Sequence, residues 1–449
     1  MVLDGQFDDW PARAQQPVTG CGTTDHVFLR VAIGGKPVNL QGLDRPRTLL
    51  LDWDQNPKTG NEQGHDAAIV FSPASQQGRG VSVGPADAPH ASWDTLGLTF
   101  APTTASNQFE VRLPRTLILD GQTHTAGDSI RWTFDNTQGI AQTAPKQPAP
   151  PPALATPLPP PANDAMRVVA WNLEFGNVLH QREQVIRLLA AMQPHVVLLQ
   201  EVESSQRAAD LLRVFREAMP NTQWTLRLGP SGGRIRSGIA TRLPAWDVPT
   251  FERLSRADSP RSTVRTAALV VQGPDQRRML CVSAHLKCCG VIGGPEDMKR
   301  IGEVQAIRRA MDAAVLDNAV PSFHGVLIGG DLNLVGSTMP LDLLIRGGQA
   351  MVGGQGDLII AKAMQPDGLG SQTWQKPGQD FSPGRLDWLV YGGLGLTAQR
   401  ALVLDTLDLS ADQLAAMQLK PSDTGVASDH LPILVDFTYK AKPAQTPLK

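Results

Sequence analysis

The chain has 449 residues, more than one hydrophobic core usually organises, so its length predicts two domains. Its 41% hydrophobic and 19% charged residues are those of an ordinary globular protein. Residues 1–164 carry 11 Lys and Arg against 16 Asp and Glu, and residues 165–449 carry 30 against 27; neither balance indicates a dedicated DNA-binding surface. No stretch approaches the roughly 18 apolar residues needed to span a bilayer.

Residues 1–143 contain short strand-like runs and almost no helical periodicity. Turn-forming Gly, Pro, Asn and Asp separate these runs, a pattern typical of an antiparallel β-sandwich. The predicted strands cover residues 26–32, 48–53, 67–71, 109–113 and 130–134.

A proline-rich run follows this first domain. Residues 144–162 contain nine prolines, each of which removes a backbone donor and fixes φ. Such a run behaves as a semi-rigid polyproline-II spacer of roughly 3.1 Å per residue, or up to about 60 Å. We therefore predict a linker over residues 144–164 between two modules that need not touch. A chain starting at Ala165 is expected to fold and act alone.

Residues 165–440 change to strands that alternate with helices. Val185, Leu188, Leu189 and Met192 recur at helical spacing between two apolar runs, and a later helix is expected to bury Ile301, Val304, Met311 and Val315. This pattern predicts an α/β core with helices covering sheets, followed by a tail over 441–449. The predicted strands cover 167–171, 195–199, 238–241, 267–271, 279–284, 326–329, 386–390 and 433–437.

Polar side chains cluster where these strands end. A single acid or histidine at such a place is usually a cap or a structural residue, but nine acid, amide and imidazole groups exceed what turns require. Hydrolysis of a phosphate ester needs a hard dication with oxygen ligands, a carboxylate to activate water, and an imidazole oriented by another carboxylate. Four residues of the strand-end set, Glu201, Asp331, His430 and Asp387, can fill these roles. The whole set is Asn172, Glu174, Glu201, His285, Asp331, Asn333, Asp387, Asp429 and His430.

Six segments of this region together resemble the endonuclease/exonuclease/phosphatase superfamily. They occur in the family's order over about 270 residues, and as a set they are highly specific. The resemblance implies a four-layer α/β sandwich, two mixed β-sheets flanked by helices. The segments are WNLEFGN (171–177), LLQEVES (198–204), SAHL (283–286), IGGDLNLVG (328–336), RLDWLVY (385–391) and SDHLPILVDF (428–437).

The same resemblance assigns a role to each residue. Mg²⁺ or Mn²⁺ is implied at a metal site formed by Asn172, Glu174, Glu201 and Asp429, with Glu201 as the principal ligand. Asp331 and Asn333 resemble the pair that positions or activates the attacking water. His430 resembles the histidine that contacts phosphate, oriented by Asp387, and His285 resembles a second histidine near the leaving group.

The expected function is therefore metal-dependent hydrolysis of a phosphate ester in a nucleic acid, a nucleotide or a phospholipid headgroup. A nuclease-like phosphodiesterase is favoured over a phosphomonoesterase or a sphingomyelinase-like phospholipase. The lack of a tyrosine near residues 237–244 argues against an abasic-site enzyme. A non-catalytic glycan- or phosphate-binding protein is the alternative of another class. Substrate choice is expected to lie in loops 229–236, 288–297 and 369–383.

The N-terminal domain resembles the β-sandwich of family-nine carbohydrate-binding modules and DOMON-like domains. LDGQFDDW (3–10), LLLDWDQNPKTGN (49–61) and HDAAIVF (65–71) carry this resemblance. A structural Ca²⁺ at Asp52, Asp54, Asn56 and Asp66 is one interpretation of the second segment, and plain turn chemistry is the other. Trp10, Trp53 and Trp93 are expected in the core, although stacking on a glycan or surface ligand is the alternative.

The remaining expectations concern the cysteines and the setting of the protein. Four cysteines are too few for a disulfide scaffold, and Cys288 and Cys289 are expected as free thiols or a vicinal disulfide rather than metal ligands. No signal peptide is visible at the N-terminus. A binding sandwich on a long linker nevertheless fits a secreted or periplasmic enzyme, expected to be monomeric.

Overall fold

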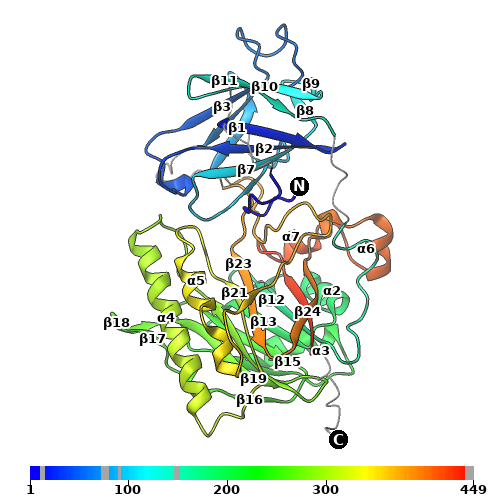
Figure 1. Cartoon of the computed structure of the whole chain (residues 1–449). Helices are drawn as coiled ribbons and strands as arrows, with labels where there is room; N and C mark the ends of the chain where they lie inside the picture. The colour runs from blue at the N-terminus through cyan, green and yellow to red at the C-terminus, as the bar shows by residue number, and fades with distance from the viewer. Residues whose placement is uncertain (11–15, 72–79, 89–92, 146–151, 380, 440–449) are drawn as a thin grey trace, which may run out of the picture.

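The structure is a computed structural model that describes residues 1–10, 16–71, 80–88, 93–145, 152–379 and 381–439. An all-β region comes first, and a larger region of mixed sheets and helices follows it (Figure 1). This arrangement confirms the predicted fold class of a β-sandwich followed by an α/β sandwich.

Two antiparallel sheets form the N-terminal region, with strand orders β1-β2-β7-β6 and β11-β10-β3-β4-β5. Because successive side chains of a strand point to opposite faces, Val27, Leu29 and Val31 of β2 enter the core between the sheets. The strands are β1 (Val18–Gly22), β2 (His26–Ala32), β3 (Arg47–Asp52), β4 (Ala67–Phe71), β5 (Val81–Pro85), β6 (Thr99–Ala101), β7 (Gln108–Pro114), β10 (Ser129–Phe134) and β11 (Thr137–Gln142), with a separate hairpin of β8 (Thr116–Leu119) and β9 (Gln122–Thr125).

Two six-stranded mixed sheets form the centre of the second region. Their strand orders are β14-β15-β13-β12-β25-β24 and β16-β19-β20-β21-β23-β22, and each contains one parallel pair, β12–β13 and β20–β21. The first sheet consists of β12 (Met166–Asn172), β13 (Val196–Glu203), β14 (Thr225–Leu228), β15 (Ile235–Thr241), β24 (Leu396–Val403) and β25 (Ile433–Tyr439). The second consists of β16 (Ala245–Asp247), β19 (Arg265–Gln272), β20 (Arg278–His285), β21 (Gly325–Asp331), β22 (Ile359–Ile360) and β23 (Asp387–Gly393).

Helices cover the outer faces of this pair of sheets. The longest, α4 (Pro295–Leu316), buries Val304 and Met311 as expected, but Val315 is exposed and Ala314 takes its place on the buried face. The prediction was wrong there because the buried face of α4 continues through Ile307 and Ala310 to Ala314, one residue earlier than the predicted stripe. The other helices are α1 (Asn177–His180), α2 (Arg182–Met192), α3 (Ala208–Ala218), α5 (Met339–Ile345), α6 (Ala411–Met417) and α7 (Asp423–Ala427).

The central strands are buried on both faces, which explains their continuous apolar runs. In β12, Val169 and Trp171 pack in the layer with α2 and α3, whereas Val168 and Ala170 pack between the two sheets. A strand with one face in water would alternate apolar and polar residues instead. The four layers are therefore helices, sheet, sheet and helices.

Residues 152–162, the later part of the proline-rich segment, pack against the second domain, in contrast to the predicted free spacer; residues 146–151 lie outside the described residues. Leu154 and Leu158 are buried in the same core layer as α2 and α3. The Leu154 carbonyl accepts a hydrogen bond from Gln413 Nε2 at 2.7 Å, and Arg167 Nη2 donates to the Pro159 carbonyl at 2.9 Å. The prediction of a free spacer was wrong because two apolar side chains between the prolines, Leu154 and Leu158, pack into the core of the second domain.

The two domains also touch directly, which the sequence did not predict. The backbone N–H of Leu3 donates to the Leu369 carbonyl at 2.9 Å, and Phe28 of β2 packs with Trp10 against Leu369. Figure 1 shows β2 and β7 facing the second domain. Further hydrogen bonds join the sandwich to the loops of the second domain; they connect Asn39 with Gly290 and Ile292, Trp93 with Gln379, Asp94 with Gly378, Thr103 with Arg385, and Ala105 with Gly336.

Replacing Leu154 by alanine tests whether the proline-rich segment is part of the folded second domain. A buried Leu→Ala change removes apolar contacts and leaves a cavity, so Leu154→Ala should lower the free energy of unfolding by about 2–5 kcal/mol. Denaturant unfolding of the full chain measures this value. Thr156→Ala, at an exposed position of the same segment, is the control and should stay within about 0.5 kcal/mol of the unmodified chain. Equal effects of the two changes would show that the segment does not contribute to the core.

Candidate functional site

Strand direction brings the polar strand-end residues to one edge of the paired sheets. β12, β13, β20 and β21 end near this edge, and the antiparallel strands β23 and β25 begin there. The register places Asp331, the last residue of β21, directly opposite Asp387, the first residue of β23. Residues that are more than 200 positions apart in the sequence therefore meet at this edge.

A β-bulge in β13 sets the direction of Glu201. The pairing of β13 with β15 shifts between Leu199 and Val202, and Glu201 adopts φ +55°, a left-handed conformation that non-glycine residues seldom use. Glu201 Oε2 accepts a hydrogen bond from the Phe175 N–H at 3.0 Å, and Phe175 itself has φ +47°. Such strained residues often occur at functional sites, where the surrounding structure holds them in place.

Gly330 lets β21 approach its neighbours closely just before Asp331. Its φ of +137° is accessible to glycine, and a Cβ there would lie 2.2 Å from the Ala284 carbonyl oxygen and 2.7 Å from Gln200 Nε2. A side chain would therefore displace the backbone that carries Asp331.

Glu201, His285 and Asp331 form a buried cluster of candidate metal ligands. One ligand atom from each lies within 4.8 Å of the other two. His285 Nε2 is 3.8 Å from Glu201 Oε1 and 3.5 Å from Asp331 Oδ2. His285, which the family resemblance assigned to a place near the leaving group, thus lies beside the two carboxylates.

Two amide side chains hold the Asp331 carboxylate. Asn172 Nδ2 donates to Asp331 Oδ2 at 3.0 Å, and Asn333 Nδ2 donates to the same oxygen at 2.9 Å. The Asn333 backbone N–H donates to Asp331 Oδ1 at 2.9 Å, and its φ of +49° allows this tight turn. Burial, followed by the nearby carboxylates of Asp387 and Glu201, raises the pKa of Asp331 to about 8.

His430 and Asp387 form a buried hydrogen-bonded pair on the other side of Asp331. His430 Nδ1 lies 2.7 Å from Asp387 Oδ2, and His430 Nε2 lies 3.9 Å from Asp331 Oδ2. Burial alone would lower the pKa of His430, but the charges of Asp387 and Asp331 and the hydrogen bond outweigh it and raise the pKa to about 10. His430 is therefore a cation at neutral pH, and its Nε2 lies 3.4 Å from Asn172 Nδ2, inside the site.

His285 has the opposite protonation state. It is almost completely buried, and burial together with the positive charges of Arg265, His430 and Lys287 holds its pKa well below the ordinary value. A neutral imidazole can accept a proton or ligate a metal ion, which a protonated one cannot. The site thus holds one charged and one neutral histidine near the same oxygen of Asp331.

Lys376 is a member of the site that the sequence did not reveal. Its Nζ is 2.5 Å from Glu174 Oε1 and 3.3 Å from Asp429 Oδ2. Glu174 and Asp429 are two of the four residues predicted to hold the metal, and both form ion pairs with this lysine. Its only signal in the sequence was its place in the loop 369–383, expected to govern substrate choice.

The predicted Ca²⁺ ligands of the sandwich do not come together as a set. Asp52 forms an ion pair with Arg131, and Asn56 Oδ1 accepts the Lys58 N–H at 3.2 Å. Asp54 and Asp66 instead lie beside His124. The four-residue prediction was wrong because Asp52, inside β3, and Asp54, beyond its end, have different partners.

The tryptophans of the sandwich are core residues. Trp10, Trp53 and Trp93 are 5%, 0% and 6% exposed, so none offers a face for stacking on a sugar. Their indole N–H groups donate to Glu110, to the Arg115 carbonyl and to the Gln379 carbonyl. The prediction of buried tryptophans is confirmed, and the residues on which a glycan-binding surface depended are inaccessible.

The donor set of the catalytic cluster fits a divalent cation. Glu201 and Asp331 present carboxylate oxygens in a buried space, and burial, ahead of every other cause, raises the pKa of the Glu201 carboxyl. Buried carboxylates are unfavourable when too little positive charge lies near them. A hard dication such as Mg²⁺ supplies that charge and takes carboxylate oxygens as ligands. Within the described residues, no helix is long and apolar enough to cross a membrane, and all four cysteines are free thiols.

Comparison with known proteins covers the second domain. Residues 169–430 match the model of the endonuclease/exonuclease/phosphatase family. A search of curated proteins found no match.

Several solved structures resemble part of the chain. A humanized D. rerio TDP2 is 16% identical, with 61% of this chain and 99% of that chain covered and a TM-score of 0.38. The 3′ phosphatase NExo from Neisseria is 16% identical, with 61% and 100% covered and a TM-score of 0.39. ANGEL2, a 2′,3′-cyclic phosphatase, is 12% identical, with 61% and 95% covered and a TM-score of 0.40.

The family match spans more than half of the chain and includes every residue of the strand-end site. The protein therefore belongs to the endonuclease/exonuclease/phosphatase family and is a metal-dependent phosphoric ester hydrolase.

Proposed function

We propose that the protein is a phosphodiesterase that cleaves nucleic acid or a nucleotide-like diester by attack of water on phosphorus. The observation that carries this proposal is a pair of histidines beside one carboxylate, with His285 Nε2 3.5 Å and His430 Nε2 3.9 Å from Asp331 Oδ2. Their surroundings raise the pKa of His430 and lower that of His285. Two imidazoles of opposite protonation state suit a reaction that needs both positive charge at the phosphate and a group that can accept a proton.

Glu201 and Asn172 would be ligands of Mg²⁺ or Mn²⁺, and Asp331 and water molecules would complete the coordination. Carboxylate and amide oxygens are the ligands that both ions prefer. The bound dication supplies positive charge next to the phosphoryl oxygens, where negative charge develops.

The residues around the metal position have separate roles in the reaction. Asp331, fixed by the amide groups of Asn172 and Asn333, orients the attacking water. A bound dication would lower the pKa of Asp331 from its raised value of about 8 and so leave the carboxylate able to accept the proton of that water. The charged Nε2–H of His430 donates to a nonbridging phosphate oxygen, and Asp387 keeps its ring in place. His285, which is neutral, remains available to the same water or to the metal ion.

The rim of the site supports a substrate that carries a ring. Phe175 is 50% exposed, and its neighbours Glu174 and Glu201 belong to the site. Arg234 Cζ lies 5.9 Å from the centre of the Phe175 ring, so a flat cation and an aromatic face occur together. Base stacking on an aromatic side chain beside a cation is a common means of holding single-stranded nucleic acid.

A substrate panel tests the proposed function. The purified chain, supplied with Mg²⁺ or Mn²⁺, is assayed on a single-stranded oligonucleotide, bis-p-nitrophenyl phosphate, p-nitrophenyl phosphate and sphingomyelin. The proposal expects the two diesters to be cleaved well above the monoester and the phospholipid. Preference for p-nitrophenyl phosphate or for sphingomyelin would contradict it.

Glu201→Gln tests the metal assignment. Loss of the carboxylate charge should weaken Mg²⁺ binding and reduce kcat roughly 10²–10³-fold, because the charge stabilising the phosphoryl oxygens is lost. Activity assays across a Mg²⁺ titration measure both effects. Glu203→Gln, two residues along the same strand and outside the cluster, is the matched control and should behave as the unmodified enzyme. Full activity in excess chelator would rule out the mechanism.

The His430–Asp387 pair predicts a specific pH dependence. His430 holds its proton below its folded pKa of about 10 and loses it as pH rises through that value, so kcat should fall on the alkaline side near pH 10. Asp387→Asn removes a charge that raises this pKa, so the fall should move to lower pH. His430→Ala should lower kcat about 10²–10⁴-fold with little change in the Mg²⁺ requirement.

The double variant provides the control for this pair. If Asp387 acts through the ring, Asp387→Asn should have no further effect on kcat once His430 is alanine. An unchanged pH profile in Asp387→Asn, or additive losses in the double variant, would show that the two residues do not act as a pair.

Phe175→Ala tests the ring-binding rim. Loss of one stacked base costs about 1–3 kcal/mol, so KM for the oligonucleotide should rise about 5-fold or more while hydrolysis of a diester without a ring is unchanged. Trp246→Ala is the control, because Trp246 is also exposed and has Arg278 at 5.9 Å but lies on β16, outside the site. Equal effects of the two changes on KM would exclude a specific role for Phe175.

A further inference from the structure

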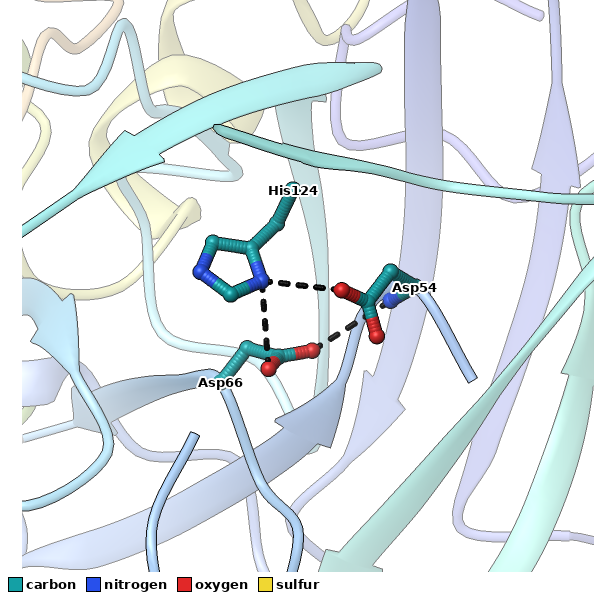
Figure 2. Close-up of side chains that lie close together, drawn as sticks. All are labelled: Asp54, Asp66 and His124. Carbon is teal, nitrogen blue, oxygen red and sulfur yellow. Dashed lines mark hydrogen bonds and ion pairs between the residues drawn. The ribbon is translucent and has the colours of Figure 1, made fainter. Parts of the chain in front are cut away.

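A second group of candidate metal ligands lies in the N-terminal sandwich. Asp54 follows β3, Asp66 immediately precedes β4, and His124 lies in β9 of the separate hairpin. One ligand atom from each lies within 4.8 Å of the other two. Figure 2 shows both carboxylates directed toward the same ring nitrogen of His124.

The separations suit ligands that share one small ion. His124 Nδ1 is 3.0 Å from Asp54 Oδ2 and 3.2 Å from Asp66 Oδ1. Two ligands bound at about 2.0–2.1 Å to a tetrahedral Zn²⁺ lie about 3.3 Å apart. The three side chains therefore stand at the spacing of a coordination shell with only small adjustment.

Asp66 is held in a way that leaves one oxygen free for such an ion. Its Oδ2 accepts the backbone N–H groups of Trp53 at 2.8 Å and Asp54 at 3.3 Å. Its Oδ1 accepts no hydrogen bond of good geometry and has only the His124 ring nitrogen beside it, at 3.2 Å, and the Asp66 side chain is 0% exposed. A buried carboxylate oxygen without a partner is unfavourable unless a cation meets it.

The His124 ring alone does not compensate the negative charge of both carboxylates. The single Nδ1–H faces two carboxylates, and a single N–H serves one acceptor well at a time. Asp54 Oδ1 also accepts the Thr59 hydroxyl at 3.0 Å, which fixes the orientation of this carboxylate. A dication bound by one nitrogen and two oxygens would compensate both carboxylates at once.

We propose that Asp54, Asp66 and His124 bind a divalent transition-metal ion of the zinc class, with water in the remaining position. The imidazole favours such an ion over Ca²⁺, which takes six to eight oxygen ligands. The oxygen donors needed for Ca²⁺ are engaged elsewhere, since Asp52 pairs with Arg131 and Asn56 Oδ1 accepts the Lys58 N–H.

The ion would connect two parts of the sandwich that have no shared strand pairing. Asp54 and Asp66 bound the loop between β3 and β4, and His124 belongs to the β8–β9 hairpin, which forms its own two-stranded sheet. Asp54 is 19% exposed at its side chain, which leaves a route for the ion from solvent. Binding should therefore stabilise the fold of the sandwich.

Zinc titration of the full chain tests this proposal. In a Glu201→Gln background, which weakens the catalytic cluster, the dialysed chain should bind Zn²⁺, and its Tm should rise with Zn²⁺ but much less with Ca²⁺. His124→Asn and Asp54→Asn should each remove about one bound ion per chain and the rise in Tm. Asp120→Asn is the matched control, because Asp120 is an exposed residue of the turn in the same hairpin and asparagine accepts its φ of +49°.

Three outcomes would overturn the proposal. Zn²⁺ stoichiometry in His124→Asn equal to that in Asp120→Asn would show that the cluster binds nothing. A Ca²⁺-dependent rise in Tm that persists in His124→Asn would indicate an oxygen-only site. If His124→Asn or Asp54→Asn fails to fold, the Glu201→Gln chain still decides the matter, since no rise in its Tm with Zn²⁺ excludes the site.

Discussion

Three carboxylates brought out of water at one edge of two packed sheets dominate the second domain. Glu201, Asp331 and Asp387 meet there because the pairing of β21 with β23 places two of them opposite each other and a bulge in β13 turns the third toward them. Such a concentration of negative charge is unfavourable in a protein interior unless positive charge compensates it. The cationic ring of His430 supplies part of the compensation, and the remaining demand is what a dication meets.

The contacts between the domains give the sandwich a part in shaping this site. Asn39 binds the segment after His285, Ala105 binds Gly336 just beyond Asn333, and Thr103 binds Arg385 just before Asp387. Each of these hydrogen bonds holds a loop next to a residue of the site: His285, Asn333 or Asp387. The sandwich thus stabilises the rim of the site, and a second domain cut at Ala165 would lose both these contacts and the buried leucines of the connecting segment. The sequence predicted two independent domains, whereas hydrogen bonds and apolar contacts join the two domains in the structure.

Much of the second domain could be predicted from the sequence, because strands buried on both faces read as unbroken apolar runs that end at polar residues. Runs such as the one before Asp331 thus marked both a strand and the place where its functional side chain emerges. The role of Lys376 could not be predicted because it lies in an irregular loop whose path no local sequence pattern determines. The contact of His124 with Asp54 could not be predicted because 70 residues separate them and no spacing motif connects them. Leu154 and Leu158 were masked by the prolines around them, although two isolated apolar residues in such a run can dock on a neighbouring core.

In the proposed mechanism, the buried carboxylates at the strand ends hold the catalytic dication beside His430. Anomalous diffraction from crystals of the full chain grown with Mn²⁺ would locate this ion. We expect a manganese peak about 2.1 Å from an oxygen of Glu201, with Asn172, Asp331 and the His430 ring nearby. Crystals of active enzyme with manganese bound only at other places, such as beside His124, and none at Glu201 would contradict it.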